Sequence, residues 1–289
     1  MTPETPWLVG LDLGPRCSGA LRFARLLREQ LHMHVVGVYV REMWPFALPL
    51  GEVTALTLPP RTGAEGWLAA LNAGKPGAPV DAARIVHDID AVVGLSTTAR
   101  EAAGVVVGRR AAAPNAWTRL GRVARQMLRR LPAPTIVVPP ELASAEFTGP
   151  VMLATDLSDH CAAAARFAVA FARKLGRPLV CVHVAQPRWD GSHGLLEPRR
   201  DELHATYREA TERATRDWAN RLCPDAAITS EYGEPVERLT ELVEHSRPSL
   251  LVLGSGRPGM LERIFTGSTA STVAAVAPCA VAVIPPDTP

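Results

Sequence analysis

The sequence of 289 residues has few of the features that mark secreted, membrane or metal-binding proteins. Its five cysteines, spread from Cys17 to Cys279, include no C-x-x-C pair, which argues against a disulfide framework or a cysteine-based metal site. We therefore expect reduced, mostly buried thiols and a cytoplasmic protein. No apolar run approaches the roughly 18 residues of a transmembrane helix, and the N-terminus lacks the pattern of a signal peptide.

A strong charge of either sign is also absent. The 31 basic and 29 acidic residues leave a net charge of +2, so composition gives no general attraction to nucleic acid or to a membrane surface. We expect neither as a partner. The hydrophobic fraction of 47% is typical of a folded globular protein, and the chain is long enough for two domains with buried cores.

The sequence does contain an internal repeat. Residues 7–40 align without a gap to residues 151–184, at a constant separation of 144 residues. The aligned identities include Asp12 with Asp156, each at the end of the first apolar run of its copy. Agreement at this level indicates a duplicated unit of about 140 residues.

Both copies alternate apolar strands with helical stretches, and both end in an apolar run followed by two prolines. Fully apolar strands are typical of a parallel sheet that helices cover on both faces. The pattern therefore predicts the doubly wound α/β class. We expect two domains, residues 1–142 and 148–289, that pack together because the polar linker between them is short.

The two copies differ in the middle. The second has a long charged helical stretch near residues 199–222, where the first has only residues 66–79, interrupted by Gly and Pro. Between Gly94 and Gly108 the first copy has 13 residues, and between Gly233 and Gly254 the second has 20. This difference predicts that the first copy has lost about two helical turns. We expect the two domains to have unequal roles.

Three glycines, Gly254, Gly256 and Gly259, spell G-x-G-x-x-G directly after the apolar run 251–253. A dinucleotide-binding fold places that motif after the first strand, with an acidic residue about 20 residues later. Here the motif follows the fourth strand of its unit. A P-loop requires Lys and then Ser or Thr after the last glycine, where Met260 stands. Neither assignment fits this stretch.

A wider spacing fits better. Gly254 and Gly267 are 13 residues apart, and Ser268 and Thr269 follow at once. With Asp156 at the end of the first strand, this spacing resembles the signature of the universal stress protein family, and the resemblance covers nearly the whole chain, twice. It implies two tandem Rossmann-like domains of the adenine nucleotide alpha hydrolase-like fold, each with a five-stranded, mostly parallel sheet flanked by helices.

The resemblance also implies a function. The C-terminal domain would bind ATP, with or without Mg²⁺, and act as a sensor or switch in the stress response. Glycines let backbone N–H groups converge on phosphate, and a following helix adds its N-terminal groups. Asp156 would accept a hydrogen bond from adenine or ribose, and Val184 would line the adenine pocket. The candidate binding residues are Asp156, Val184, Gly254, Gly256, Arg257, Gly259, Gly267, Ser268 and Thr269.

The sequence departs from the family pattern in both copies. Arg257 stands where the signature has its second glycine, and it either supplies donors to phosphate or deforms the loop. In the first copy Ala111 and Arg122 replace the second glycine and the serine, and Pro114 lies inside the loop. We therefore expect the N-terminal site to be empty and not to bind ATP in the family manner.

Purely structural roles stay open for the same residues. Asp156 fits a turn or a helix cap, Gly254 and Gly267 fit close packing, and Ser268 fits a helix cap. The arginine-rich stretch 109–130 fits either an anionic partner or a solvated helix face. No aromatic residues are interleaved as in single-strand binding, and we favour the solvated face.

We expect no catalytic and no metal-binding residue. Residues 87–90 fit a surface loop, and His183 fits a histidine of the core or crevice. Activity would be at most slow ATP hydrolysis. The alternatives are a nucleotide-free module that docks a partner protein and an enzyme of the wider hydrolase-like superfamily. The resemblance further implies that the domains pair through their last strands, residues 135–140 and 280–286, and it allows a homodimer.

Overall fold

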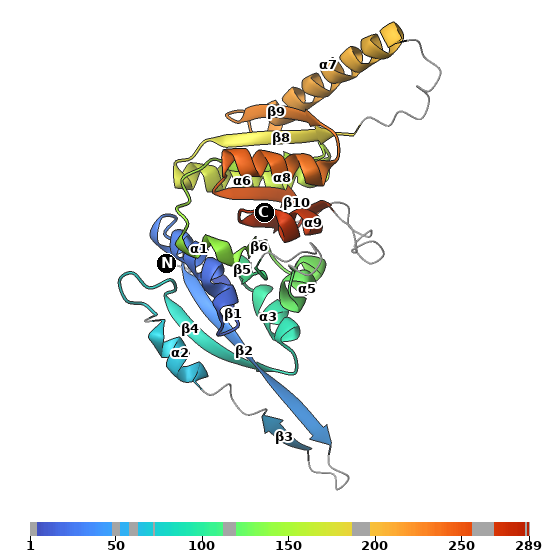
Figure 1. Cartoon of the computed structure of the whole chain (residues 1–289). Coiled ribbons are helices and arrows are strands. Elements are labelled where there is room, and N and C mark those ends of the chain that lie inside the picture. Colours follow the sequence, from blue (N-terminus) through green and yellow to red (C-terminus); the bar gives the residue numbers. More distant parts are fainter. Residues whose placement is uncertain are drawn as a thin grey trace.

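The computed structural model describes residues 5–47, 53–57, 63–71, 73–111, 120–186, 197–255, 269–286 and 288. The described residues form one eleven-stranded sheet in the order β3-β2-β1-β5-β6-β11-β10-β7-β8-β9, with β4 also paired to β2 (Figure 1). The strands are β1 (Trp7–Leu11), β2 (Val35–Ala47), β3 (Val53–Thr57), β4 (Ala82–Asp88), β5 (Gly104–Gly108), β6 (Thr135–Val138), β7 (Val151–Thr155), β8 (Leu179–Ala185), β9 (Ala227–Tyr232), β10 (Leu250–Gly254) and β11 (Val281–Ile284).

Each half of the chain contributes a run of five parallel strands. The run is β4-β2-β1-β5-β6 in the first half and β9-β8-β7-β10-β11 in the second. Every residue of β7 is buried, as are all but the last residues of β5 and β10. Strands buried on both faces are typical of parallel sheets. The predicted α/β fold with a mostly parallel sheet is confirmed.

The two runs join where β11 pairs antiparallel with β6. Val281 lies opposite Val137 and Ala282 opposite Ile136, and every residue of both strands is buried. Burying the last strand of each half removes an open sheet edge with unpaired backbone groups from both halves at once.

Helices cover both faces of this sheet. One face carries α1 and α6, and the other carries α3, α5, α8 and α9, and each layer includes helices from both halves. Alternate residues of the central strands fill two hydrophobic cores, so Val252 belongs to the first core and Leu251 to the second. The helices are α1 (Ser18–Glu29), α2 (Ala64–Ala70), α3 (Ala91–Ala99), α5 (Arg122–Arg130), α6 (Ala162–Leu175), α7 (Glu197–Leu222), α8 (Pro235–Ser246) and α9 (Thr269–Val276), and the short 3-10 turns are η1 (Pro15–Cys17), η2 (Pro140–Ser144) and η3 (Asp159–Cys161).

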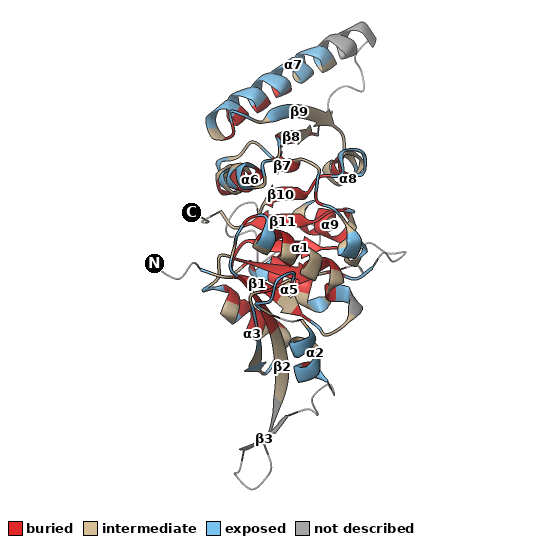
Figure 2. Ribbon diagram, turned by 90° about the vertical axis from the view of Figure 1, so that its left-hand side faces the viewer, coloured by how far each residue is buried: buried red, intermediate tan, exposed pale blue. Residues whose placement is uncertain are grey.

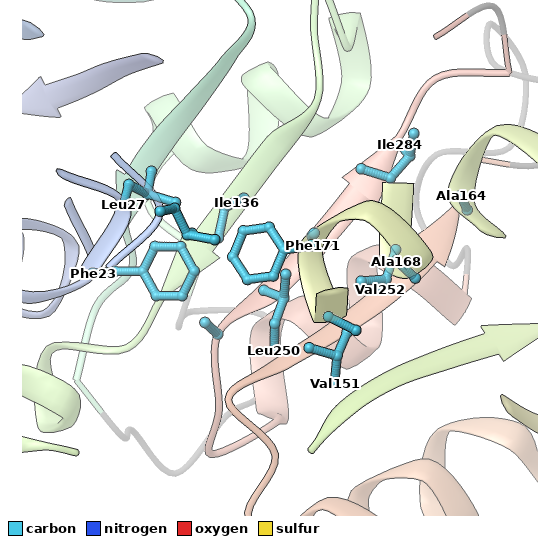
Figure 3. Close-up of a cluster of buried hydrophobic side chains, with 14 of the residues drawn as sticks. Phe23, Leu27, Ile136, Val151, Ala164, Ala168, Phe171, Leu250, Val252 and Ile284 are labelled. Atoms are coloured by element: carbon cyan, nitrogen blue, oxygen red, sulfur yellow. The ribbon is translucent and has the colours of Figure 1, made fainter. Parts of the chain in front are cut away.

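Aromatic side chains connect α1 and α6 across the junction of the halves (Figure 3). The rings of Phe23 and Phe171 stack with centroids 6.3 Å apart, and Phe147 meets Phe23 edge to face at 5.2 Å. Phe23 is fully buried and Phe171 is 2% exposed. Large buried aromatic rings dominate the energetics of such a contact. The first core is therefore shared by both halves, and Figure 2 shows buried residues running through the middle of the molecule.

The predicted loss of two helical turns from the first half is wrong. Helix α3 has nine residues and α8 has twelve, so the difference is about one turn. The two helices begin at Ala91 and Pro235, which are 144 residues apart as the repeat requires. The error came from the glycines: Gly94 lies inside α3, whereas Gly233 precedes α8.

The halves differ instead in the segments after their second strands. In the second half α7 has 26 residues and extends away from the sheet, with most of its visible surface exposed (Figures 1 and 2). In the first half β2 extends to 13 residues and pairs antiparallel with β3, and the next helix, α2, has seven. The sequence pattern predicted the short helix, the long one and the charge of the long one, but not the hairpin of β2 and β3.

Candidate functional site

A pocket of about 520 Å³ opens in the second half of the chain. It lies at the carboxyl ends of β7, β8 and β10 and is closed by the starts of α8 and α9. The chain leaves β7 toward β8 on one side and reaches β10 on the other, so the pocket sits where the strand order reverses. Open α/β sheets bind ligands at such a switch point. Of the nine predicted binding residues, the pocket is lined by Asp156, Val184, Gly254 and Thr269.

Asp156 follows β7 directly and holds its carboxylate at the pocket. The Oδ1 atom accepts hydrogen bonds from the Ser158 amide at 3.0 Å, the Ser158 hydroxyl at 2.6 Å and the Cys161 thiol at 3.2 Å. Burial opposes ionisation, but these hydrogen bonds outweigh it and hold the pKa of Asp156 below its usual value. The group is an ionised acceptor at neutral pH, and the three bonds to Oδ1 make the turn that was one of its two predicted structural roles.

The turn around Asp156 has a strained backbone. Leu157 has a φ of 63°, in the left-handed region, and its amide donates to the Thr155 hydroxyl at 2.9 Å. The equivalent residue of the first half, Leu13, has a φ of 56°. A non-glycine residue in this region costs free energy, and such strained residues cluster at functional sites. The repeat therefore keeps an unfavourable backbone conformation beside the aspartate in both halves.

At the end of β10, Gly254 allows a close approach of α6 to the strand, and the hydroxyl of the next residue, Ser255, lacks a hydrogen-bond partner among the described residues. A Cβ at Gly254 would lie 3.1 Å from the Cys161 sulfur, so glycine lets the start of α6 approach the strand. The next residue, Ser255, also lines the pocket. Its Oγ atom is buried and has no hydrogen-bond partner among the residues described. Buried polar atoms are nearly always paired, so the partner of this one lies outside the described residues.

The end of β8 supplies an apolar wall and a histidine. Val184 and Leu239 face the pocket, as does His183, whose Nδ1 lies 2.8 Å from the Thr155 carbonyl oxygen. A carbonyl only accepts, so Nδ1 carries the hydrogen. Of the core and crevice positions predicted for His183, the crevice is the observed one. Burial raises the pKa of the Cys161 thiol to about 11, which keeps this pocket residue protonated and unreactive.

The phosphate-loop candidates mostly lie outside the described residues. This applies to Gly256, Arg257, Gly259, Gly267 and Ser268, and to Pro114 of the first half. Thr269 is described: it is the exposed first residue of α9, and with Ala270 it borders the pocket. The N-terminal end of α9, with the partial positive charge that unpaired N–H groups give a helix start, is thus directed at the pocket.

The first half has an equivalent pocket of about 550 Å³. Asp12 lines it at the end of β1, and its Oδ1 accepts from the Gly14 amide at 2.9 Å. The lining also includes Arg122 at the start of α5, where the predicted serine position falls. Arg122 forms ion pairs with Glu42, at 2.9 Å, and with Asp90. This cation therefore lies at the pocket with both acidic partners supplied from within the fold.

The arginine-rich stretch 109–130 is divided between two environments. Arg125, Arg129 and Arg130 are exposed on α5, as the solvated-face hypothesis predicts. Arg109 is 4% exposed and contacts the second half of the chain. The residues 112–119 lie outside the described part of the chain.

Neither a metal centre nor a membrane helix is found in the described part of the chain. No group of three or more His, Cys, Asp or Glu side chains there is placed to hold a metal ion. No described helix combines the length and the apolar character needed to cross a bilayer. All five cysteines are buried and unbridged.

Several pocket residues were missed from the sequence, among them Ser255 and Tyr207. Ser255 was passed over although it immediately follows the first signature glycine, and that neighbour could have drawn attention to it. Tyr207 reaches the pocket from α7, nearly 50 residues before the loop, and no spacing rule predicts that contact.

Comparisons with known proteins agree with this architecture. The sequence model of the universal stress protein family matches residues 148–285. A universal stress protein from Thermus aquaticus is 31% identical over 138 residues, which make up 46% of this chain and 96% of that protein. The match therefore spans nearly the whole relative and about half of this chain.

Solved structures share the fold over the full length. A universal stress protein from Archaeoglobus fulgidus DSM 4304 has a TM-score of 0.66, covering 98% of this chain and 99% of its own, at 16% identity. A functionally unknown protein from Pseudomonas aeruginosa PAO1 has a TM-score of 0.64, covering 99% of this chain and 94% of its own, at 14% identity. At these identities both likenesses concern the fold alone.

Proposed function

The chain belongs to the universal stress protein family, and on this premise we propose that it binds one adenine nucleotide, ATP, in the pocket of its C-terminal domain. The domains are residues 1–142 and 148–289, and the bound nucleotide serves as a signal in the stress response of the cytoplasm. The observation that carries the proposal is the ionised Asp156 at a pocket that is also lined by Ser255, whose buried hydroxyl has no hydrogen-bond partner among the described residues.

The donor set of the pocket fits an adenine nucleotide. Asp156 offers carboxylate oxygens to an adenine amine or a ribose hydroxyl, and Val184 and Leu239 offer an apolar surface to the base. The start of α9 faces the same space and suits a phosphate group. Ser255 would supply a hydroxyl between these two regions. Mg²⁺ would neutralise part of the charge of the triphosphate when it is bound.

The pocket favours binding over rapid chemistry. Asp156 is held by Ser158 and Cys161, and His183 is tied to the Thr155 carbonyl, so neither is an evident base for a water. Phosphoryl transfer requires a positioned nucleophile and charge stabilisation at the transition state. We therefore propose that hydrolysis is slow at most and that occupancy carries the signal.

The N-terminal pocket is proposed to hold no ATP. Its size is similar, but Arg122 lies at the wall with Glu42 and Asp90 as partners. A phosphate would have to compete with two carboxylates for this guanidinium, and those carboxylates would repel it. This contrast supports one nucleotide per chain.

The nucleotide content of the purified full-length protein tests the proposal. The protein is denatured, and the released small molecules are separated by ion exchange and identified by mass. Emptied protein is then titrated calorimetrically with ATP and Mg²⁺. About one adenine nucleotide per chain is expected. About two would refute the empty N-terminal pocket, and none in either measurement would leave a nucleotide-free module that docks a partner.

A further inference from the structure

Arg109 crosses the junction between the two halves. It follows β5 directly, and its amide donates to the Val138 carbonyl of β6 at 3.0 Å. Its side chain is buried and reaches into the second half, where Nη1 donates to the Ala275 carbonyl at 2.5 Å and Nη2 to the Ala277 carbonyl at 2.9 Å. These bonds span 166 and 168 residues of sequence.

Ala275 lies in the last turn of α9, and Ala277 is the first residue after this helix. The last four carbonyls of a helix have no partner within it, and a cation there complements the helix dipole. The fork of donors on a guanidinium can satisfy two carbonyls at once, which an ammonium group on a flexible chain does less well. Arg109 therefore acts as the cap of a helix that lies in the other half of the chain.

The opposite end of α9 borders the C-terminal pocket through Thr269 and Ala270. The helix has eight residues, so its two ends are only about 12 Å apart at 1.5 Å per residue. A helix this short moves as one body. Fixing its C-terminal end on Arg109 therefore also fixes where its N-terminal N–H groups point.

The repeat shows that this contact is specific to one half. Ser255 follows β10 as Arg109 follows β5, and its amide makes the matching bond to the Ile284 carbonyl at 3.1 Å. The backbone is thus equivalent at both positions, but the side chains differ. Arg109 also borders the N-terminal pocket, but its guanidinium reaches the second half, whereas Ser255 lines the C-terminal pocket within its own half.

We propose that Arg109 is a positioning residue for the phosphate end of the nucleotide bound in the C-terminal pocket, acting through α9. This inference rests on the proposed function, since it requires a nucleotide with its phosphates at the start of α9. Through Arg109 the N-terminal half contributes to ligand binding without binding the ligand itself. Burial is part of the reason: a buried guanidinium must keep its hydrogen bonds, so its two carbonyl partners hold the helix firmly.

The proposal predicts a selective loss of affinity for one ligand, which a general loss of stability would not cause. Adenosine and ATP share the base and ribose, and only ATP reaches the start of α9 with its phosphates. Removing the Arg109 cap should therefore weaken ATP and leave adenosine unchanged. The expected loss for ATP is about three- to tenfold, the range of a single charge interaction at a helix terminus.

The experiment measures both affinities by calorimetry on full-length, nucleotide-free protein with Mg²⁺ present. The variants are Arg109→Met, which removes the donors, and Arg109→Lys, which keeps the charge without the planar fork. The control is Arg110→Met, since Arg110 is the exposed neighbour in sequence. We expect Arg109→Met to lose ATP affinity selectively, Arg109→Lys to lose less, and Arg110→Met to match the parent protein.

Each other outcome overturns the inference. Equal losses for ATP and adenosine would show a purely structural role, and unchanged ratios in both Arg109 variants would show no role. If Arg109→Met does not fold, a parent-like ATP-to-adenosine ratio in Arg109→Lys is the result that refutes the proposal. If the parent protein binds no ATP, the proposed function is refuted, and this result is distinct from a failure of the Arg109 proposal because it needs no variant.

Discussion

The two pockets of this chain are nearly equal in size and differ in the charge of their walls. The N-terminal pocket, of about 550 Å³, is lined by five arginines and two acidic residues. The C-terminal pocket, of about 520 Å³, has Asp156 as the one Asp, Glu, Lys or Arg in the part of its wall that the structure describes. Both halves of the repeat therefore keep a cavity at the carboxyl ends of their strands. The two halves differ in the side chains that line this cavity and not in its presence.

The largest expected effect comes from the core that the two halves share. Phe171→Ala removes a ring that stacks on Phe23 of the other half, and it should cost about 3–5 kcal/mol of unfolding free energy. Because both halves contribute to this core, we expect one cooperative transition that moves to lower urea. Fluorescence and circular dichroism should report the same midpoint.

The control for this variant is Leu203→Ala on α7, since Leu203 is 44% exposed. Its unfolding free energy should stay within about 0.5 kcal/mol of the parent protein. Two separate transitions in Phe171→Ala would show that the halves fold independently and that the shared core is energetically minor.

The matched aspartates provide the next largest effect. Asp156→Asn should weaken ATP by about ten- to a hundredfold, the range for a lost hydrogen bond to a charged group. Asp12→Asn, the same change 144 residues earlier, should leave ATP binding as it is. Calorimetry on both variants makes the comparison directly. If Asp12→Asn loses ATP and Asp156→Asn does not, the assignment of the two pockets is reversed.

The smallest effect concerns the ion pairs of the N-terminal pocket. Arg122→Ala removes contacts to Glu42 and Asp90, but Arg122 is half exposed, with 53% of its side chain accessible. The cost in unfolding free energy should be about 1 kcal/mol or less and should shrink as salt is raised. Arg125→Ala, on the exposed side of the same helix, is the control. A salt-independent loss would contradict a screened surface pair.

The sequence was most informative where the repeat constrained it. A constant separation of 144 residues was enough to pair Asp12 with Asp156, and the fully apolar runs of both copies were enough to predict parallel strands buried on both faces. The sequence was misleading where the position of a single glycine, Gly94, was used to estimate the length of a helix. A Cβ at Gly94 would lie 2.9 Å from the Val40 side chain. This glycine is therefore required for close packing inside α3 and does not mark a loop.

The contacts between the halves could not be predicted in the same way. Arg109 and Ala275 are far apart in sequence, and nothing local to either residue indicates the other. In the same way, Tyr207 on α7 lies far in sequence from the other residues of the pocket that it reaches. Such contacts depend on how the elements pack, which the pattern of one chain does not encode locally. The strands and the aspartate were within reach of the sequence, but the helix cap across the junction was not.

The pairing of β6 with β11 also affects how the protein behaves on dilution. Two separate chains joined at these strands would dissociate as their concentration falls. Here both strands belong to one chain, so their effective local concentration is fixed by the linker and not by the amount of protein in the cell. The union of the halves is therefore insensitive to expression level, and neither half can exchange its partner for a copy from another molecule without first breaking this pairing.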